Sequence, residues 1–213
     1  MRFLVTAGPT REPIDPVRFL SNRSSGRMGY AVARAAAARG HDVVLVSGPV
    51  ALEEPAGVRR VSVGTAAEML AAVREALPAC DALVMSAAVA DWRPASVADR
   101  KIKKSEGRME LALTRTEDIL LATRALRVGR VTVGFAAETG EAEPEARRKL
   151  RDKGLDLVVA NDVTQPGAGF EVDTNAVTFI AASGEVWRTG VEPKDAIALR
   201  IVEWVEAEWG RRG

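Results

Sequence analysis

Polar residues suited to binding an anion gather early in the chain, in the segment 8–26. In order, this segment contains Arg18, Asn22, Ser24, Ser25 and Gly26. The last three directly precede a helical pattern, where main-chain N–H groups, the helix dipole and serine hydroxyls together suit a phosphate. The same residues also fit a plain serine N-cap, with Gly29 one turn later allowing the helix to pack closely on a sheet. The spacing alone does not decide between these interpretations.

A second polar segment follows the apolar stretch 81–86. Its small residues Ser86 and Ala87 would let a flat ligand approach the backbone, and Asp91 can accept hydrogen bonds from a ribose or ligate a metal. Three lysines come later in the segment: Lys101, Lys103 and Lys104. A run of this kind is usually a solvated surface. A triphosphate also needs mobile cations, and this segment lies on the same expected edge as the serine-rich turn.

Two further groups of residues remain open to more than one interpretation. Lys149 and Lys153 lie one helical turn apart, where they are either cations favoured by a helix C-terminus or ligands of an anion. A polar segment near the C-terminal third contains Asn161, Phe170, Asp173 and Asn175. Asn and Asp commonly cap their own backbone in turns, and each polar position fits that role. Phe170 is less easily explained as a turn residue.

Apolar runs and helical patterns alternate along the chain. Strands are expected at residues 2–7, 42–47, 58–63, 81–86, 109–114, 131–137, 156–160 and 176–182, and helices at 27–39, 65–77, 116–126, 144–154 and 193–209. Because most of these strands are nearly continuous apolar runs, they indicate a mostly parallel sheet covered on both faces. We therefore predict one α/β domain over residues 1–213, with a doubly wound, Rossmann-like sheet.

In a sheet of this type, ligands bind beyond the carboxyl ends of the strands. The loops expected at that edge, 8–26, 87–108, 137–144 and 161–175, are the long or polar ones. The dinucleotide fingerprint G-x-G-x-x-G is missing, and the segment 47–49 carries no acidic residue for a ribose. An NAD-type oxidoreductase is therefore weakened as an alternative but not excluded. A non-catalytic nucleotide-binding subunit is a second alternative.

The composition of the chain argues against several classes of function and site. The 30 basic and 29 acidic residues give a net charge of +1, which argues against nucleic-acid or anionic-membrane binding. The only histidine, His41, lies at an expected helix-to-strand turn and reads as structural, so a zinc site or a histidine-activated nucleophile is not expected. The only cysteine, Cys80, reads as a small buried apolar residue. With no apolar run long enough to cross a bilayer, we expect a cytoplasmic protein.

Several motifs, taken in order, resemble those of the phosphopantothenate–cysteine ligase family. They are VTAGPTREPIDPVRFLSNRSSGRMG, SGPV, SAAVADWRP, KIKK, VGFAAET, NDV and GFEVDTN. This family is the ligase half of the bacterial bifunctional flavoprotein of coenzyme A synthesis. The resemblance implies that 4′-phosphopantothenate attacks the α-phosphate of CTP to form an acyl-cytidylate and pyrophosphate. The amine of L-cysteine then forms the amide and releases CMP.

The resemblance also assigns residues. Asn22 would hydrogen-bond the acyl phosphate or a developing oxyanion, and Lys101 would neutralise phosphate and turn the intermediate over. The nucleotide contacts carried over are Met85, Ser86, Ala87, Asp91, Lys101, Glu117, Asp118, Ile119, Leu120, Phe135, Lys149 and Lys153. This sequence departs from the family at RTEDI, where many relatives have Asn-Pro before the Asp, which puts the assignment of Glu117 in doubt.

The resemblance implies CTP as the substrate nucleotide, with Mg²⁺ carried mainly by that nucleotide, and no flavin in this domain. It also implies a homodimer, in which GFEVDTN is a candidate for a loop that crosses to the neighbouring chain. A decarboxylase is expected as a fused or associated partner.

Overall fold

The computed structural model describes residues 1–104, 108–138, 142–162 and 172–213. Within this part of the chain, an eight-stranded sheet runs in the order β13-β12-β10-β9-β6-β1-β4-β5. The strands, in chain order, are β1 (Arg2–Ala7), β4 (Asp42–Ser47), β5 (Val58–Ser62), β6 (Ala82–Met85), β9 (Val131–Glu138), β10 (Leu157–Asp162), β12 (Val177–Ala181) and β13 (Val186–Arg188). All pairings from β5 to β10 are parallel, whereas β12 and β13 pair antiparallel.

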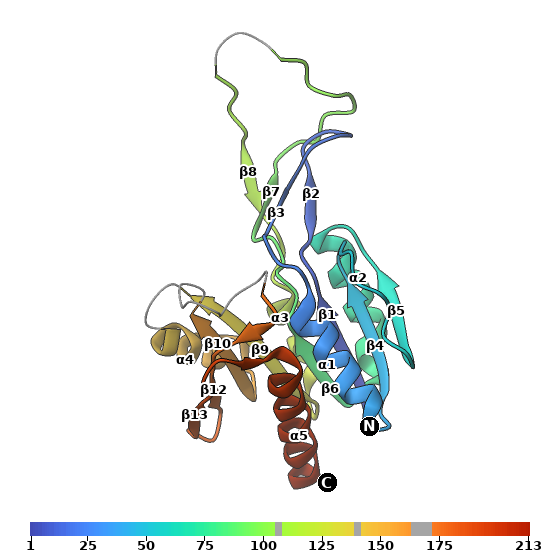
Figure 1. Ribbon diagram of the computed structural model, residues 1–213. Helices are drawn as coiled ribbons and strands as arrows, with labels where there is room; N and C mark the ends of the chain where they lie inside the picture. Colours follow the sequence, from blue (N-terminus) through green and yellow to red (C-terminus); the bar gives the residue numbers. More distant parts are fainter. Residues whose placement is uncertain (105–107, 139–141, 163–171) are drawn as a thin grey trace.

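Helices cover both faces of this sheet (Figure 1). The bounds are α1 (Arg27–Ala38), α2 (Ala66–Ala76), α3 (Ile119–Ala122), α4 (Ala142–Lys153) and α5 (Lys194–Arg212), with 3₁₀ turns η1 (Leu77–Ala79) and η2 (Arg124–Arg127). Helices α1 and α5 share one core cluster, and α2, α3 and α4 contribute to the other. The predicted doubly wound fold is confirmed. Strand order reverses beside β1, with β4 on one side and β6 on the other.

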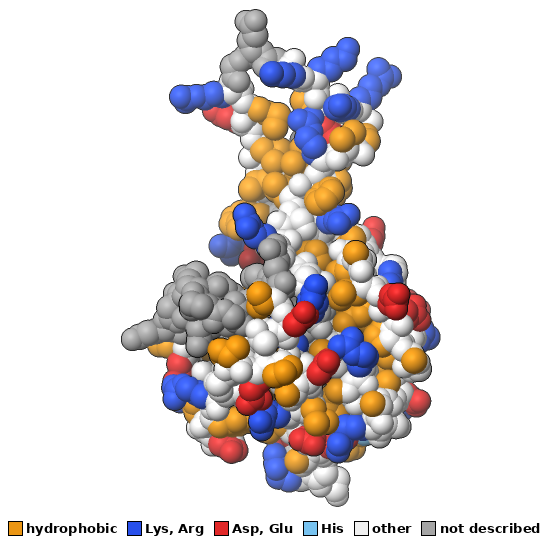
Figure 2. Space-filling model, viewed as in Figure 1, with side chains coloured by type: hydrophobic (Ala, Val, Ile, Leu, Met, Phe, Trp, Pro, Cys, Tyr) orange, Lys and Arg blue, Asp and Glu red, His pale blue; other side chains and the backbone are white. Residues whose placement is uncertain are grey.

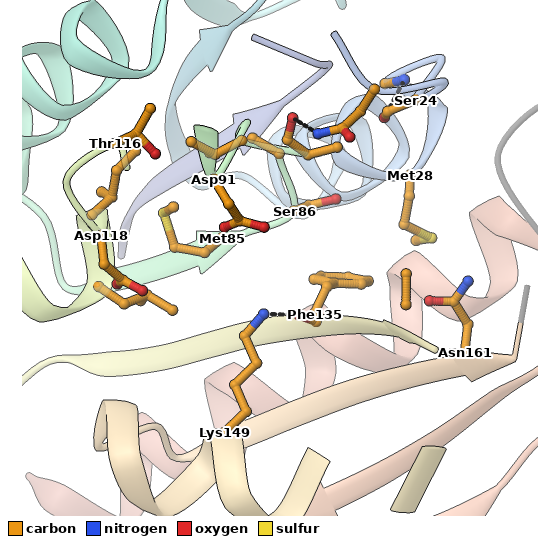
Figure 3. A pocket seen from close by; sticks show the side chains of 18 of the residues that line it. Ser24, Met28, Met85, Ser86, Asp91, Thr116, Asp118, Phe135, Lys149 and Asn161 are labelled. Carbon is orange, nitrogen blue, oxygen red and sulfur yellow. Dashed lines mark hydrogen bonds between the residues drawn. The ribbon is translucent and has the colours of Figure 1, made fainter. Parts of the chain in front are cut away.

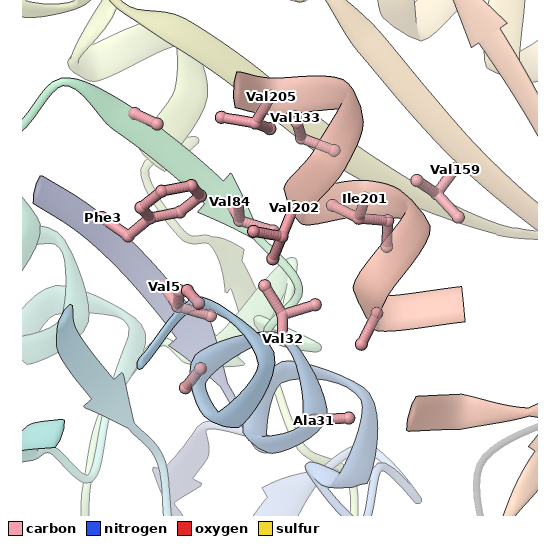
Figure 4. Packing of buried hydrophobic residues seen from close by; sticks show 14 of the residues in the cluster. Phe3, Val5, Ala31, Val32, Val84, Val133, Val159, Ile201, Val202 and Val205 are labelled. Carbon is pink, nitrogen blue, oxygen red and sulfur yellow. The ribbon is translucent and has the colours of Figure 1, made fainter. Parts of the chain in front are cut away.

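Strand β1 shows why the central strands are apolar throughout. Phe3 and Val5 point to the α1–α5 face, whereas Leu4 points to the opposite cluster, and all three are fully buried. Successive side chains of a strand face opposite sides, so a strand covered on both faces must be apolar at every position. Figure 4 shows Phe3 and Val5 packed with Val32 of α1 and Val202 of α5.

An arm projects from the carboxyl end of the sheet (Figure 1). It consists of two antiparallel ribbons, β2 (Arg11–Pro13) with β3 (Phe19–Ser21) and β7 (Trp92–Pro94) with β8 (Leu113–Arg115), and the described residues between the strands of each ribbon. The remaining strands, β11 (Thr174–Asn175) and β14 (Glu192–Pro193), pair with each other. No described helix is both long enough and apolar enough to cross a membrane.

Two sequence predictions are wrong in this region. The strand expected at 109–114 is absent from the main sheet, and only its end enters β8, which pairs with β7 in the arm instead. The helix expected at 116–126 is divided into α3 and η2. Thr123 lies between them, and its hydroxyl donates to the Ile119 carbonyl at 2.7 Å.

His41 and Cys80 have the structural roles that were expected. The His41 ring stacks on Phe3, with centroids 5.0 Å apart, and its Nε2 lies 2.6 Å from Glu206 Oε1 of α5. Cys80 is buried, its thiol donates to the Ala76 carbonyl at 3.3 Å, and burial raises its pKa. Both residues fasten helices to the sheet, far from the loops at its carboxyl edge.

Helix α1 approaches β1 closely at Gly29. A Cβ at this position would lie 2.6 Å from the Ala7 Cβ and 2.8 Å from the Thr6 carbonyl oxygen. Both neighbours belong to the central strand and have little room to move. Gly29 therefore sets the distance between the start of α1 and the end of β1.

We predict that Gly29→Ala lowers the free energy of unfolding by about 1–3 kcal/mol, because the new methyl group overpacks this contact. Gly210→Ala is the matched control, since a Cβ there would meet no described atom within 4 Å and alanine favours a helix. Urea unfolding measures both variants. Equal stability of Gly29→Ala and the parent protein would contradict the packing argument.

A second prediction concerns pH. The hydrogen bonds from Arg39 are the largest influence on Glu206, and with His41 they outweigh burial and lower its pKa from 4.5 to about 2. A carboxyl group whose pKa is lower in the folded state stabilises the fold above its unfolded pKa, and this contribution is lost as pH falls from about 4.5 towards 2.

Urea unfolding across this range should therefore show a smaller loss of stability in Glu206→Gln than in the parent protein. Glu75→Gln, at an exposed position on α2, serves as the control and should keep the parental slope. The ion-pair argument fails if both variants have the same slope.

Candidate functional site

A cavity of about 720 Å³ opens at the carboxyl ends of β1, β6, β9 and β10. Its lining comes mainly from the end of the first loop with the start of α1, the segment after β6, the segment leading into α3, and the ends of β9 and β10. Single residues of α4, β11 and α5 complete it. Figure 3 shows Ser86 and Asp91 on one side of this space and Phe135 and Lys149 on the other. The cavity lies at the reversal of strand order, where ligands bind in doubly wound sheets.

The α1 end of the cavity is built by glycines. Gly8 ends β1 with φ 74°, and Gly26 caps α1 with φ 78° and makes no side-chain cap hydrogen bond. A Cβ on Gly26 would lie 3.2 Å from the Gly8 Cα, so the two backbones almost touch. The interpretation as a plain serine N-cap is therefore wrong. The N-cap is Gly26, and the Gly26 N–H donates a hydrogen bond to the Ser24 hydroxyl oxygen at 3.3 Å.

The segment after β6 is held by one threonine near the end of β1 and one in the first loop. Thr6 Oγ1 accepts from the Ala87 N–H at 3.2 Å, and Thr10 Oγ1 accepts from the Ala90 N–H at 3.0 Å. Both threonines are fully buried. These contacts keep the small residues that line the cavity in an extended path and leave Asp91 exposed at the end of the segment.

Asn22 joins these two walls. Its side-chain Nδ2 donates to the Ala88 carbonyl at 2.9 Å, and Asn22 lines the cavity. An amide nitrogen carries two hydrogens, so one N–H can hold the wall while the other serves a ligand. This contact spans 66 residues of sequence and could not be anticipated from spacing.

The opposite wall carries charge. Asp118 caps α3 by accepting from the Leu121 N–H at 2.9 Å, and its other oxygen accepts from Lys153 Nζ at 2.6 Å. Burial is the largest influence on Asp118 and opposes ionisation, but these hydrogen bonds and the charge of Lys153 and Lys149 lower its pKa overall. Lys149 Nζ donates to the Phe135 carbonyl at 2.5 Å and lines the cavity (Figure 3).

Glu117 lines the cavity despite the departure from the family motif at this point. Its carboxylate accepts from Arg74 of α2 at 2.8 Å, and Ile119 and Leu120 follow it in the cavity wall. The acidic residues of this wall are thus balanced by Arg74 and Lys153, which lie outside the lining.

Two cations that the sequence did not indicate lie at the α1 end of the cavity. Lys194, the first residue of α5, is buried and lines the cavity, and its Nζ donates to the Val172 carbonyl at 2.5 Å. Burial, and then the charge of Arg27, lower the pKa of Lys194. Arg27 also lines the cavity and pairs with Asp173. A lysine directly after a proline at a helix start was the available signal for Lys194.

Most of the residues carried over from the family, and most of the loop candidates, meet in this cavity. Those that line it are Asn22, Ser24, Ser25, Gly26, Met85, Ser86, Ala87, Asp91, Glu117, Asp118, Ile119, Leu120, Phe135, Lys149, Asn161 and Asn175. Lys153 and Asp173 stand behind the lining and contact it through Asp118 and Arg27. Phe170 lies outside the described residues.

Arg18 and Lys101 are placed differently: both lie on the arm, outside the cavity lining. Arg18 pairs with Asp15, and Lys101 is exposed. Within the described ranges, no group of three or more His, Cys, Asp or Glu side chains gathers as a metal site. The cavity itself offers backbone N–H groups, an amide and several cations, a set that suits a phosphorylated ligand.

Known proteins are similar to this chain in sequence and in fold. The sequence profile of the DNA/pantothenate metabolism flavoprotein C-terminal domain matches residues 1–208. The chain is 46% identical over 205 residues to the coenzyme A biosynthesis bifunctional protein CoaBC of Bacillus subtilis (strain 168), covering 96% of this chain and 50% of that protein. It is 50% identical over 214 residues to CoaBC of Mycobacterium tuberculosis (strain ATCC 25618 / H37Rv), covering 95% and 51%.

The chain thus spans about half the length of the curated relatives it matches. Among solved structures, the crystal structure of the C-terminal domain of CoaBC superposes with a TM-score of 0.84 at 40% identity, covering 99% of this chain and 96% of that one. The resemblance carried by the motifs is confirmed. The chain belongs to the family of the C-terminal domain of DNA/pantothenate metabolism flavoproteins.

Proposed function

We propose that this chain is a phosphopantothenate–cysteine ligase of coenzyme A biosynthesis that uses CTP. The carboxylate of 4′-phosphopantothenate attacks the α-phosphorus of CTP and expels pyrophosphate, which leaves an acyl-cytidylate. The amine of L-cysteine then attacks the acyl carbon, CMP leaves with the bonding electrons, and the amine loses a proton. The product is 4′-phosphopantothenoyl-L-cysteine.

One observation carries this proposal. Residues from the first loop, the segment after β6, the start of α3, β9 and α4 line a single cavity. They include Asn22 and all the nucleotide contacts that the family resemblance assigns, apart from Lys101 and Lys153. The cavity volume of about 720 Å³ is within the usual range for a site that holds a small molecule. The reaction needs no protein nucleophile, which agrees with the structural roles of His41 and Cys80.

The α1 end of the cavity suits the phosphates. Gly26 brings the helix N-terminus to the cavity, and Lys194 and Arg27 add positive charge beside it. Pyrophosphate leaves more readily when cations and N–H groups stabilise its developing charge. Mg²⁺ enters with the triphosphate, because phosphate oxygens are ligands that this ion prefers.

The middle of the cavity suits the acyl group. Asn22 lies between the α1 turn and the segment after β6, and its second N–H can donate to the acyl phosphate or the oxyanion. Small residues at Ser86 and Ala87, with the Phe135 ring opposite, fit a flat pyrimidine (Figure 3). A mixed anhydride hydrolyses in water, so the proposed reaction needs the intermediate to be shielded from solvent until cysteine attacks.

We also propose that the chain acts as a homodimer. Large apolar side chains are exposed along the arm, at Val17, Phe19, Trp92, Val97, Met109 and Leu113. Figure 2 shows apolar side chains along the stalk of the arm and basic side chains near its end. An apolar surface of this kind is suited to packing against a second copy of the chain. Such a dimer would bring the arm that carries Lys101 towards a cavity.

The relatives bear the name "bifunctional", and this chain matches half of their length. We therefore propose that a phosphopantothenoylcysteine decarboxylase, which would consume the product, is fused to or associated with this domain.

The direct test is pyrophosphate release from CTP and from ATP, each with and without 4′-phosphopantothenate and cysteine. Release that needs phosphopantothenate, precedes amide formation and favours CTP is expected. No release with either nucleotide in the presence of both substrates would overturn the proposed function.

We predict that Asn22→Ala lowers the overall rate on the order of 10²–10³-fold, the usual effect of removing one transition-state donor. Steady-state amide formation measures this loss. Arg23→Ala is the control, since Arg23 is exposed in the same loop and lies outside the cavity lining. Amide formation by Asn22→Ala at the control rate would remove Asn22 from the mechanism.

For Lys101→Gln we predict that acyl-cytidylate accumulates while little amide forms, because the ammonium group is proposed to act on the intermediate. Quenched reactions analysed by mass spectrometry measure both species. Arg100→Gln removes a neighbouring exposed charge on the arm and should behave as the parent protein. The role of Lys101 is refuted if its variant releases pyrophosphate and forms amide at parental rates.

A further inference from the structure

The turn between β2 and β3 holds a buried carboxylate that the proposed chemistry does not use. The side chain of Asp15 is fully buried, although it lies on the projecting arm. Its two oxygens serve different partners. Oδ1 accepts from the N–H groups of Val17 at 2.8 Å and Arg18 at 2.9 Å, and thereby closes the turn.

Oδ2 of Asp15 connects this turn to the second ribbon. It accepts from the Arg18 guanidinium at 2.5 and 3.0 Å and from the Ile102 N–H at 3.1 Å. Arg18 in turn donates to the Ile102 carbonyl at 2.8 Å. Both backbone polar groups of Ile102 are therefore held by residues more than eighty positions earlier in the chain.

The other side of this segment is held as well. The Ala98 N–H donates to the Ile14 carbonyl at 3.0 Å. Lys101 thus lies between Ala98 and Ile102, two residues whose backbones are held by hydrogen bonds. Ile102, the immediate neighbour of Lys101, is held by more of these bonds than Ala98. Lys101 itself is exposed.

We propose that Asp15 is a positioning residue for Lys101, acting through Ile102 and Arg18. This inference rests on the proposed function, in which Lys101 acts on the acyl-cytidylate. The Lys101 side chain is long and flexible, so the geometry of its ammonium group depends on how firmly its backbone is held. Fixing the neighbouring residue lowers the entropy lost when the ammonium group reaches the intermediate.

The electrostatics of the contact favour this role. The hydrogen bond from Arg18 is the largest influence on Asp15 and, with the backbone N–H groups, holds its pKa well below the usual range. Asp15 therefore remains ionised at neutral pH. It offers two accepting oxygens to the turn and to Ile102 at the same time.

The substitution Asp15→Asn removes the link to Ile102 while it leaves the turn intact. The asparagine oxygen can replace Oδ1 and keep the turn, but its NH₂ group replaces Oδ2 and cannot accept from Ile102 or Arg18. Asp99→Asn is the matched control, since it makes the same change at an exposed position on the arm. Thermal unfolding and sedimentation measure whether each variant keeps the fold and the oligomeric state of the parent protein.

Two further measurements test the proposal. Amide hydrogen exchange by NMR should show the Ile102 N–H exchanging about 10- to 100-fold faster in Asp15→Asn than in the control, because a hydrogen bond to a charged group is lost. Quenched-flow analysis should show pyrophosphate release at the parental rate and amide formation slowed by about 10- to 100-fold, with acyl-cytidylate accumulating.

The proposal is overturned if the Ile102 N–H loses protection while amide formation stays at the control rate. It is also overturned if pyrophosphate release and amide formation fall equally, since that pattern indicates a general structural defect. Failure of the proposed function would look different: the parent protein would neither release pyrophosphate nor form amide, while the exchange measurement would still report on the contact between Asp15 and Ile102.

Discussion

The close contact between α1 and β1 is the constraint on which the site depends. Gly29 lets the helix lie against the end of the strand, and Gly26 and Gly8 bring the helix start against the strand exit. These three glycines perform the tasks of the dinucleotide fingerprint: a tight turn, close approach of a ligand to the backbone, and close helix–strand packing. In sequence, the first ribbon of the arm separates Gly8 from Gly26 and Gly29, which is why the contiguous motif G-x-G-x-x-G is missing.

Charged side chains surround the cavity that lies beside this contact. Asp118 and Glu117 on the α3 wall are each balanced by a cation outside the lining, whereas Lys149 and Lys194 contact backbone carbonyls in or beside the cavity. Lys149, Lys194 and Arg27 thus add positive charge to the lining of the cavity. An arrangement of this kind favours an anionic ligand with several charges, as a nucleoside triphosphate would be.

The sequence predicted the sheet well, because a strand buried on both faces leaves a continuous apolar run, as in β1 and β9. It also predicted the edge of the sheet at which the cavity lies, because long polar loops follow those strands. The arm was missed. Its ribbons are short, and their attachment depends on contacts such as the one between Arg18 and Ile102, which join residues far apart in sequence. Lys194 was missed for the same reason, because its neighbours are Arg27 of α1 and the residues Val172 and Asp173 just before β11.

The arm also makes the architecture modular. Its first ribbon begins beside Gly8 and returns beside Gly26, two residues whose backbones almost touch. Removing everything between them would leave a short turn of the ordinary nucleotide-binding kind. The domain can therefore be viewed as a doubly wound core into which the first ribbon of the arm has been inserted. Mutation can lengthen, shorten or reshape the outer part of this ribbon at little cost to the core, because the ends of the insertion are already joined in space.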